Sequence, residues 1–284
     1  MMKKYFSFIK FSHTVFALPF AVIGYFLAVS QPEYFFDWKI FALVIACMIT
    51  ARSAAMGFNR FADRFIDARN PRTAMREIPS GKISAASAFI FVLFFSLAFI
   101  TCTFFINPIC FKLSPVALAV VLGYSYTKRF TSLAHIILGI GLSLAPIGAY
   151  LAVTGEFSLL PVLFSLVVLC WVSGFDIIYA LQDEAFDKAE KLFSIPSALG
   201  KKSALNISRM LHFFSSALLV VAGVEGQFGI EYWIGAFVFI ALLIYQQQLV
   251  KPQDLSRVNL AFATTNGIAS IVFSIFVLAD LYLN

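Results

Sequence analysis

The sequence predicts an all-α, polytopic membrane protein, with nine transmembrane helices in a single bundle, its N-terminus in and its C-terminus out. Composition indicates this class first: 61% of the 284 residues are hydrophobic and 13% are charged. The mean hydropathy of +0.88 lies far above that of a soluble globular domain. Apolar runs of about twenty residues also recur along the chain, and each is long enough to cross a bilayer as a helix. We therefore expect residues 1–284 to form one transmembrane domain with no soluble module.

The nine expected spans are apolar runs separated by polar connections. In chain order they are 14–30, 39–57, 85–105, 108–127, 132–153, 160–181, 203–224, 229–249 and 260–281. Trp38 and Trp233 lie at the outer ends of the second and eighth spans, where indole rings favour the membrane interface. A cleaved signal peptide ending near residues 28–31 is the alternative interpretation of the first run.

Two kinds of connection separate these spans. The outer connections, such as those at 106–111 and 154–159, are short. They carry isolated acids, which are Glu33, Asp37, Glu156, Glu225 and Glu231. Two inner connections are long and rich in charge: residues 59–84 follow the second span, and residues 176–203 follow the sixth. Both contain an Ile-Pro-Ser tripeptide followed by a glycine, which is compatible with an internal duplication. Both face the same compartment, so we expect them to meet at the inner end of the bundle.

The placement of Lys and Arg tests this count of spans. With a cytoplasmic N-terminus, 19 of the 21 basic residues fall on the inner side, and only Lys39 and Lys112 fall outside. This asymmetry is the one that the positive-inside rule requires. The net charge of +6 therefore reflects topology, together with any anion that the inner face binds, and does not indicate nucleic-acid binding.

Each inner segment carries acids at helical spacing. In the first, Asn59, Asp63 and Asp67 are four residues apart, so one helix would present them on one side. The second contains a similar stripe at i, i+3, i+7 and i+11. Its members are Asp176, Tyr179, Asp183 and Asp187. Solvated charged loops would be the ordinary interpretation, but the acids begin inside the apolar boundary, where ionisable groups are usually functional.

The chemistry of these donors suits a metal bound together with a phosphate. Oxygen-only ligands with no neighbouring Cys or His suit Mg²⁺, which takes one or two carboxylates plus substrate phosphates. The many nearby Arg and Lys residues would be redundant around a bare metal. They are useful if the metal carries a diphosphate whose charge must be held and stabilised on departure.

The patterns NxxxDxxxD at 59–67 and DxxYxxxDxxxD at 176–187 resemble the two signatures of the UbiA superfamily of intramembrane aromatic prenyltransferases. Nine helices, with the motifs on the second and sixth, also match that family. One departure is Arg60, because the family commonly has an acid directly after the Asn.

The resemblance implies a role for each group of residues. Mg²⁺ would be held by Asn59, Asp63, Asp67, Asp183 and Asp187. The diphosphate would be neutralised by Arg72, Arg76, Lys128 and Lys188. Asp176 and Tyr179 would be catalytic, through acceptor orientation, proton removal or stabilisation of an allylic cation. His13 and Tyr124 are the candidates for contact with the acceptor.

The implied reaction is transfer of a polyprenyl group from its diphosphate to an aromatic acceptor in ubiquinone or menaquinone biosynthesis. The stretches FSHTVFALPF, NPRTAMREIPSGKIS and GFDIIYALQDEAFD are most similar to the 4-hydroxybenzoate polyprenyltransferase-like branch. That leaves 4-hydroxybenzoate or a larger futalosine-derived acceptor open. The expected partners are these two substrates and the lipid bilayer, with no nucleic acid and no protein partner. The expected location is the inner (cytoplasmic) membrane, with the active site facing the cytoplasm.

Three other classes are compatible with parts of the pattern. A secondary transporter would also carry intramembrane acids, but its site usually lies near the midplane, whereas these acids cluster at one surface. A Mg²⁺-dependent phosphatidyl transferase would need a compact motif of which only the fragment DARN, at 67–70, occurs here. A heme-farnesylating member of the same superfamily would use similar chemistry on another acceptor.

Overall fold

The computed structural model describes residues 5, 7–9 and 16–284, and in this part of the chain the regular structure is helical, apart from one isolated bridge between Lys251 and Asp254. Among these described residues, eight helical segments are long and apolar enough to cross a membrane. They are α3 (Trp38–Ala62), α5 (Ala85–Ile106), α6 (Pro108–Thr127), α7 (Ala134–Thr154), α8 (Leu159–Ala180), α10 (Ile195–Glu225), α11 (Ile230–Leu249) and α12 (Asn266–Leu283). The expectation of an all-α membrane protein is confirmed.

The ninth expected span corresponds to a shorter helix, α2 (Leu18–Val29), of 12 residues. A helix of that length rises about 18 Å, well short of the roughly 30 Å of a hydrocarbon core. Its expected start at residue 14 lies outside the described residues. The count of nine spans and the orientation of the two termini stay predictions.

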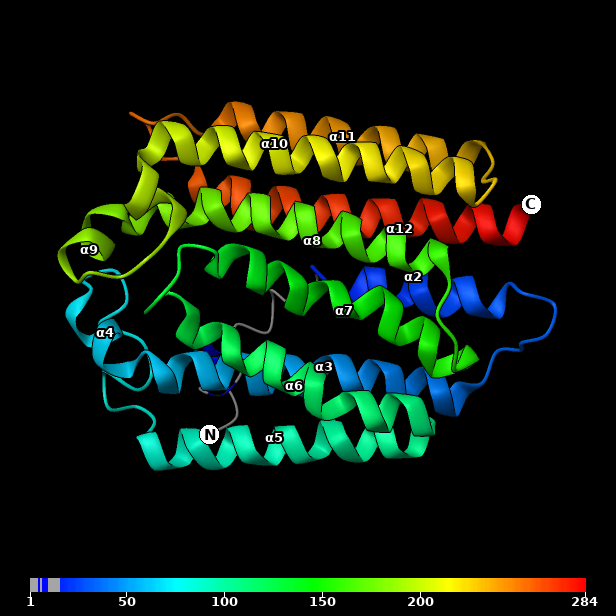
Figure 1. The fold of residues 1–284 in the computed structure, drawn as a ribbon, viewed down its shortest axis with the longest axis horizontal. Helices are drawn as coiled ribbons and strands as arrows, with labels where there is room; N and C mark the ends of the chain where they lie inside the picture. The colour runs from blue at the N-terminus through cyan, green and yellow to red at the C-terminus, as the bar shows by residue number, and fades with distance from the viewer. Residues whose placement is uncertain (1–4, 6, 10–15) are drawn as a thin grey trace.

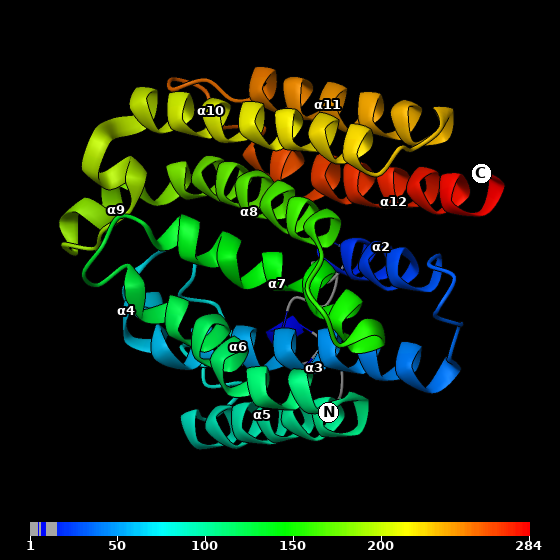
Figure 2. The same ribbon diagram turned by 45° about the vertical axis from the view of Figure 1, so that its right-hand side comes forward.

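The helices run side by side along the length of the molecule (Figure 1). The short helices α4 (Arg64–Arg69) and α9 (Glu184–Ala189), which belong to the two charged inner segments, lie at the same end of the bundle in both ribbon views (Figure 2). The C-terminus lies at the opposite end. The two segments therefore meet as expected from their spacing along the chain.

Close helix packing at the centre depends on glycines. A Cβ at Gly139 of α7 would lie 2.2 Å from the Ser173 Oγ and 2.7 Å from the carbonyl oxygen of Leu169, both on α8. A Cβ at Gly174 would lie 2.3 Å from the ring of His212 on α10. Small residues let helix backbones approach closely in membranes, so α8 is held tightly between α7 and α10.

The acidic stripes continue past the ends of their helices. α3 ends at Ala62, and Asp63 has non-helical dihedrals (φ −90°, ψ 3°) before α4 begins. Hydrogen bonds from the Asp63 N–H to the Asn59 carbonyl (2.9 Å) and from the Asp67 N–H to the Asp63 carbonyl (2.7 Å) preserve the helical spacing across this bend. The second stripe bends likewise, because α8 passes through a 3₁₀ turn (Leu181–Asp183) into α9. Each stripe thus curves over the end of the bundle, where a single straight helix had been expected.

Candidate active site

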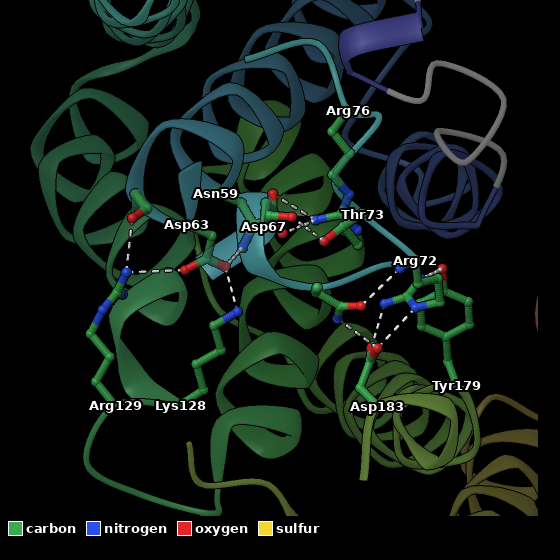
Figure 3. Close-up of polar contacts among 12 residues, drawn as sticks. Asn59, Asp63, Asp67, Arg72, Thr73, Arg76, Lys128, Arg129, Tyr179 and Asp183 are labelled. Atoms are coloured by element: carbon green, nitrogen blue, oxygen red, sulfur yellow. Dashed lines mark hydrogen bonds and ion pairs between the residues drawn. The ribbon is translucent and has the colours of Figure 1, made fainter. Parts of the chain in front are cut away.

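The carboxylate of Asp63 is buried between two cations. Its Oδ2 lies 2.6 Å from the Lys128 Nζ and its Oδ1 lies 3.1 Å from an Arg129 nitrogen. The side-chain amide of Asn59 also donates to Asp63, at 3.3 Å. Figure 3 shows Lys128 and Arg129, from the loop after α6, both extended toward Asp63. Burial raises the pKa of the Asp63 carboxyl, and the charges of Lys128 and Arg129 oppose that rise.

Two cations on one carboxylate leave a local excess of positive charge. Arg129 was not singled out from the sequence as a site residue, although it directly follows Lys128. It also donates to the carbonyl oxygens of Ala62 and Ser125, both at 2.9 Å, which fixes the loop after α6 against the end of α3. Because a buried charge needs an opposite charge, this arrangement favours binding of an anion beside Asp63.

Asp67 makes a separate ion pair with the loop that follows α4. Arg76 donates from a single nitrogen to both carboxylate oxygens, at 2.8 and 2.9 Å. The side chain of Asp67 is only 5% exposed, and that of Arg76 is 24% exposed. The hydroxyl of Thr73 donates to the main-chain carbonyl of Asp67 at 3.1 Å, which holds the loop against α4.

Asp183 joins the two inner segments. Arg72 makes two hydrogen bonds to its carboxylate, one of them 2.9 Å long from Nε, and Asn70 adds a third at 3.1 Å. Another nitrogen of Arg72 donates to the hydroxyl of Tyr179 at 2.9 Å, so Arg72 lies between Tyr179 and Asp183 (Figure 3). Burial disfavours the charged form of Arg72, but its contacts with Asp183 and Tyr179 outweigh burial and raise its pKa.

Asp187 and Lys188 are neighbours in the sequence, but their side chains have different partners. Asp187 is half-buried on α9, interacts with the side chain of Ser194, and lies within electrostatic range of Asp183 and Lys128. Lys188, expected to hold the diphosphate, instead forms an ion pair with Glu184 at 2.7 Å, and its side chain is 50% exposed. The structure therefore does not bring Lys188 to the acids.

Asp176 has a partner that the sequence did not reveal. Its Oδ2 lies 2.7 Å from the Nδ1 of His135, a buried residue in the first turn of α7. His135 has no metal-ligand spacing to other residues, and 41 residues separate it from Asp176. No local pattern could have indicated this contact.

Two further arginines on α3 have buried nitrogen atoms without a hydrogen-bond partner among the described residues. Arg60, the residue that departs from the family pattern, is 4% exposed, and its Nε and Nη1 have no partner among the described residues. Arg52 likewise has an unpartnered Nε. Buried donors of this kind cost free energy unless an acceptor reaches them.

Arg52 lines a cavity of about 390 Å³ between α3, α5, α6 and α7. The lining is mostly apolar, with Tyr124 as another of its polar members. Tyr124 interacts electrostatically with both Asp63 and Asp176, so this part of the cavity adjoins the acids. Tyr124, expected near an acceptor, thus lies between the cavity and the acidic cluster, while His13 lies outside the described residues.

The carboxylates of the site can hold a metal ion only together with a further ligand. Within residues 5, 7–9 and 16–284, no three carboxylate, imidazole or thiol groups are grouped to hold one ion by themselves. Mg²⁺ at phosphate sites commonly takes one or two carboxylates and completes its shell with phosphate oxygens and water. The oxygen-only pairs Asp63 with Asp67, and Asp183 with Asp187, suit that mode, and the surrounding cations suit the phosphates.

Comparison with known proteins agrees with this chemistry. A model of the UbiA prenyltransferase family matches residues 17–273 of the chain. The chain is 31% identical over 246 residues to a 4-hydroxybenzoate octaprenyltransferase of Nitrosomonas europaea, covering 87% of this chain and 84% of that protein. It is 29% identical over 243 residues to the 4-hydroxybenzoate octaprenyltransferase of Tolumonas auensis, covering 86% and 85%.

The fold is similar to that of solved structures. The apo structure of a UbiA homolog from Aeropyrum pernix K1 matches with a TM-score of 0.85 and 32% identity, over 94% of this chain and 98% of that one. A UbiA homolog from Archaeoglobus fulgidus, bound to GPP and Mg²⁺, matches with a TM-score of 0.78 and 20% identity, over 99% and 100%. The family match spans most of the chain, from residue 17 to residue 273: this protein belongs to the UbiA prenyltransferase family.

Proposed function

We propose that this protein transfers a polyprenyl group from a polyprenyl diphosphate to a small aromatic acceptor, with Mg²⁺ as cofactor. The single observation that carries the proposal is a cluster beside an apolar cavity in which acids of both inner segments are paired with cations of the first inner segment and of the loop after α6. Relatives named 4-hydroxybenzoate octaprenyltransferase support 4-hydroxybenzoate or a related quinone precursor as the acceptor. A structural neighbour bound to GPP and Mg²⁺ supports the use of a diphosphate with a divalent metal.

The charged cluster would bind the diphosphate end of the donor. Asp63, Asp67, Asp183 and Asp187, with Asn59, would hold Mg²⁺. When bound, the ion neutralises phosphate oxygens and stabilises the departing diphosphate.

The cations already paired with these acids would turn to the phosphates. They are Arg72, Arg76, Lys128 and Arg129. Fixed positive charges aimed at a leaving group lower the barrier most when water is excluded. Asp63 and Asp67 are both buried, which suits that requirement.

The chemistry exchanges one bond for another. The bond between the allylic C1 and the diphosphate oxygen breaks, and the electron pair leaves with the diphosphate. A ring carbon of the acceptor then attacks C1, and the proton at that ring carbon is lost to a base. Asp176, whose second oxygen has no fixed partner among the described residues, would accept this proton. The Tyr179 ring, beside Arg72, would face the allylic cation.

The cavity offers a place for the organic parts of the substrates. Its apolar walls suit an isoprenoid chain, because burial of hydrocarbon is favourable. Arg52 has a buried N–H without a partner, and a benzoate carboxylate would satisfy it. Tyr124, on the same wall, would orient the ring. An acceptor with a carboxylate is therefore the best match to this end of the cavity.

The proposal includes the membrane and the side of it on which the active site lies. The positive-inside pattern supports an active site on the cytoplasmic side of the inner membrane, within a single domain formed by residues 1–284. The transporter alternative has no comparable support, because α4 and α9, which belong to the two acidic segments, lie at one end of the bundle (Figure 1) and the chain belongs to a prenyltransferase family.

The test is prenyl transfer by the purified protein in detergent or liposomes. The reaction would contain Mg²⁺, a long-chain prenyl diphosphate and either 4-hydroxybenzoate or a futalosine-type aromatic acid, with an EDTA control. We expect a metal-dependent prenylated product from one acceptor. Absence of product with both acceptors, in protein that binds the diphosphate, would refute this choice of acceptor. Absence of metal-dependent diphosphate binding would refute the function itself.

A further inference from the structure

His135 is held at both of its ring nitrogens. Its Nδ1 lies 2.7 Å from the Oδ2 of Asp176, and the main-chain N–H of Ile195 points to its Nε2 at 3.4 Å. Ile195 is the first residue of α10, so its N–H has no partner within the helix. The ring of His135 is 5% exposed and bridges the start of α10 and the inner end of α8.

These contacts define the tautomer. A ring nitrogen that accepts a hydrogen bond carries no proton, so Nε2 is the unprotonated nitrogen. Nδ1 is then the protonated one, and it donates to the carboxylate of Asp176. The arrangement gives Asp176 a fixed donor on one oxygen and leaves the other oxygen free to act on a substrate.

The helix packing makes this contact possible. Gly139 lies one turn after His135 on α7, and its lack of a side chain lets α7 approach Ser173, three residues before Asp176 on α8. Gly174 allows the corresponding approach of α10. Three helices are therefore packed closely around the pair, which lies on the Tyr124 side of the acidic cluster.

We propose that His135 is a positioning residue for the transfer reaction: its Nδ1–H holds the Asp176 carboxylate in the orientation that receives the ring proton of the acceptor. The inference rests on the proposed function and extends it to a residue outside both motifs. In the proton-transfer step, the C–H electron pair returns to the aromatic ring and the proton goes to the free oxygen of Asp176. His135 neither gains nor loses a proton.

A purely architectural role predicts different behaviour. If His135 only caps α10, any replacement that preserves packing would leave turnover intact, and any loss of activity would follow the loss of folded protein. If it orients Asp176, the loss would be confined to the chemical step and would require Asp176. Asp187 lies within electrostatic range of His135, but the cations that would hold the prenyl diphosphate are paired with Asp63, Asp67 and Asp183, so its binding should change little.

The experiment uses two variants of His135, His135→Leu and His135→Asn. The asparagine is chosen because its amide N–H lies near the position of Nδ1. They are compared with Asp176→Asn and with the double variant His135→Leu/Asp176→Asn. All are assayed with Mg²⁺, geranyl diphosphate and 4-hydroxybenzoate. We expect His135→Leu to lower kcat by about 100-fold, the low end for loss of a general base. The KM for geranyl diphosphate should stay within about threefold of the wild type. His135→Asn should recover about tenfold, and the double variant should be no slower than Asp176→Asn alone, because residues that act as a unit are non-additive.

Each outcome has a distinct meaning. A wild type that shows no metal-dependent binding of geranyl diphosphate would refute the proposed function, and the role of His135 with it. An active wild type with a fully active His135→Leu would overturn only the role of His135. The same conclusion would follow if His135→Leu and His135→Asn lost activity equally and in proportion to a lower melting temperature. It would also follow if the fold-decrease in kcat of the double variant equalled the product of the fold-decreases of the two single variants.

Discussion

Arg76 is expected to oppose metal binding and to favour diphosphate binding. It donates to both oxygens of the buried carboxylate of Asp67, at 2.8 and 2.9 Å. A metal ion can reach that carboxylate only if the guanidinium leaves, and a diphosphate gives the guanidinium a new partner. Mg²⁺ and diphosphate should therefore bind with strong positive coupling.

The size of the effect follows from the contact that is lost. Hydrogen bonds to charged groups contribute about 1.5–3 kcal/mol, which corresponds to about a 10- to 150-fold change in a dissociation constant. In Arg76→Met, Mg²⁺ alone should bind about tenfold or more tightly than in the wild type. The prenyl diphosphate, in saturating Mg²⁺, should bind more weakly by a similar factor.

Calorimetric titration of the detergent-solubilised protein measures both constants, first with Mg²⁺ alone and then with geranyl diphosphate in excess Mg²⁺. Arg69→Met is the matched control, because Arg69 makes its ion pair with Glu190, at 2.7 Å, and its side chain is 55% exposed. Neither constant should change in the control. A change of the same sign in both constants of Arg76→Met would show that Arg76 does not exchange between Asp67 and the diphosphate.

Three further predictions concern other parts of the site. Asp183→Ala should lower kcat by at least about 100-fold with unchanged helical circular dichroism, since it removes a metal ligand from a folded bundle; near-normal turnover would exclude that carboxylate from the metal site. Arg60→Met should raise the melting temperature, because it removes buried donors that have no partner among the described residues; a lower melting temperature would contradict this reasoning. Gly139→Ala should destabilise the protein by about 1–3 kcal/mol by overpacking, which thermal unfolding would measure. It should also lower kcat, measured by steady-state kinetics, because it would move His135 away from Asp176.

Hydropathy predicted the bounds of some long apolar helices closely. The runs 85–105 and 108–127 correspond to Ala85–Ile106 and Pro108–Thr127. The reason is that a chain in hydrocarbon must satisfy its backbone hydrogen bonds internally, so an apolar run of sufficient length becomes a helix wherever it occurs. Helix ends outside the apolar region were less predictable: α10 begins at Ile195, where Ser194 forms a capping box, and this short start was not expected. Non-helical dihedrals at Gly200 (φ 76°, ψ 163°) separate it from the long helix that follows, which begins close to the expected 203.

The chemical types of the site residues were also readable from the sequence. The spacing of Asn59, Asp63 and Asp67 is a local property, and it survives the bend at Asp63 because the hydrogen bonds across the bend keep the helical register. The spacing of residues along the chain does not show which side chain each charged group contacts. Arg72 and Lys188 were equal candidates for the diphosphate, yet Arg72 reaches Asp183 whereas Lys188 turns to Glu184.

The sequence by itself determined the class of the protein, the approximate positions of its long apolar helices and the acidic motifs that indicate a metal and a diphosphate, since all of these depend on composition and on periodicity along one helix. Only the tertiary structure decided which cation faces which acid, that Arg52 lines the cavity, and that His135 contacts Asp176. Those contacts join residues on different helices, and their distances depend on how closely the helices pack. Gly139 and Gly174 set that packing for His135, because a side chain at either position would hold the three helices apart.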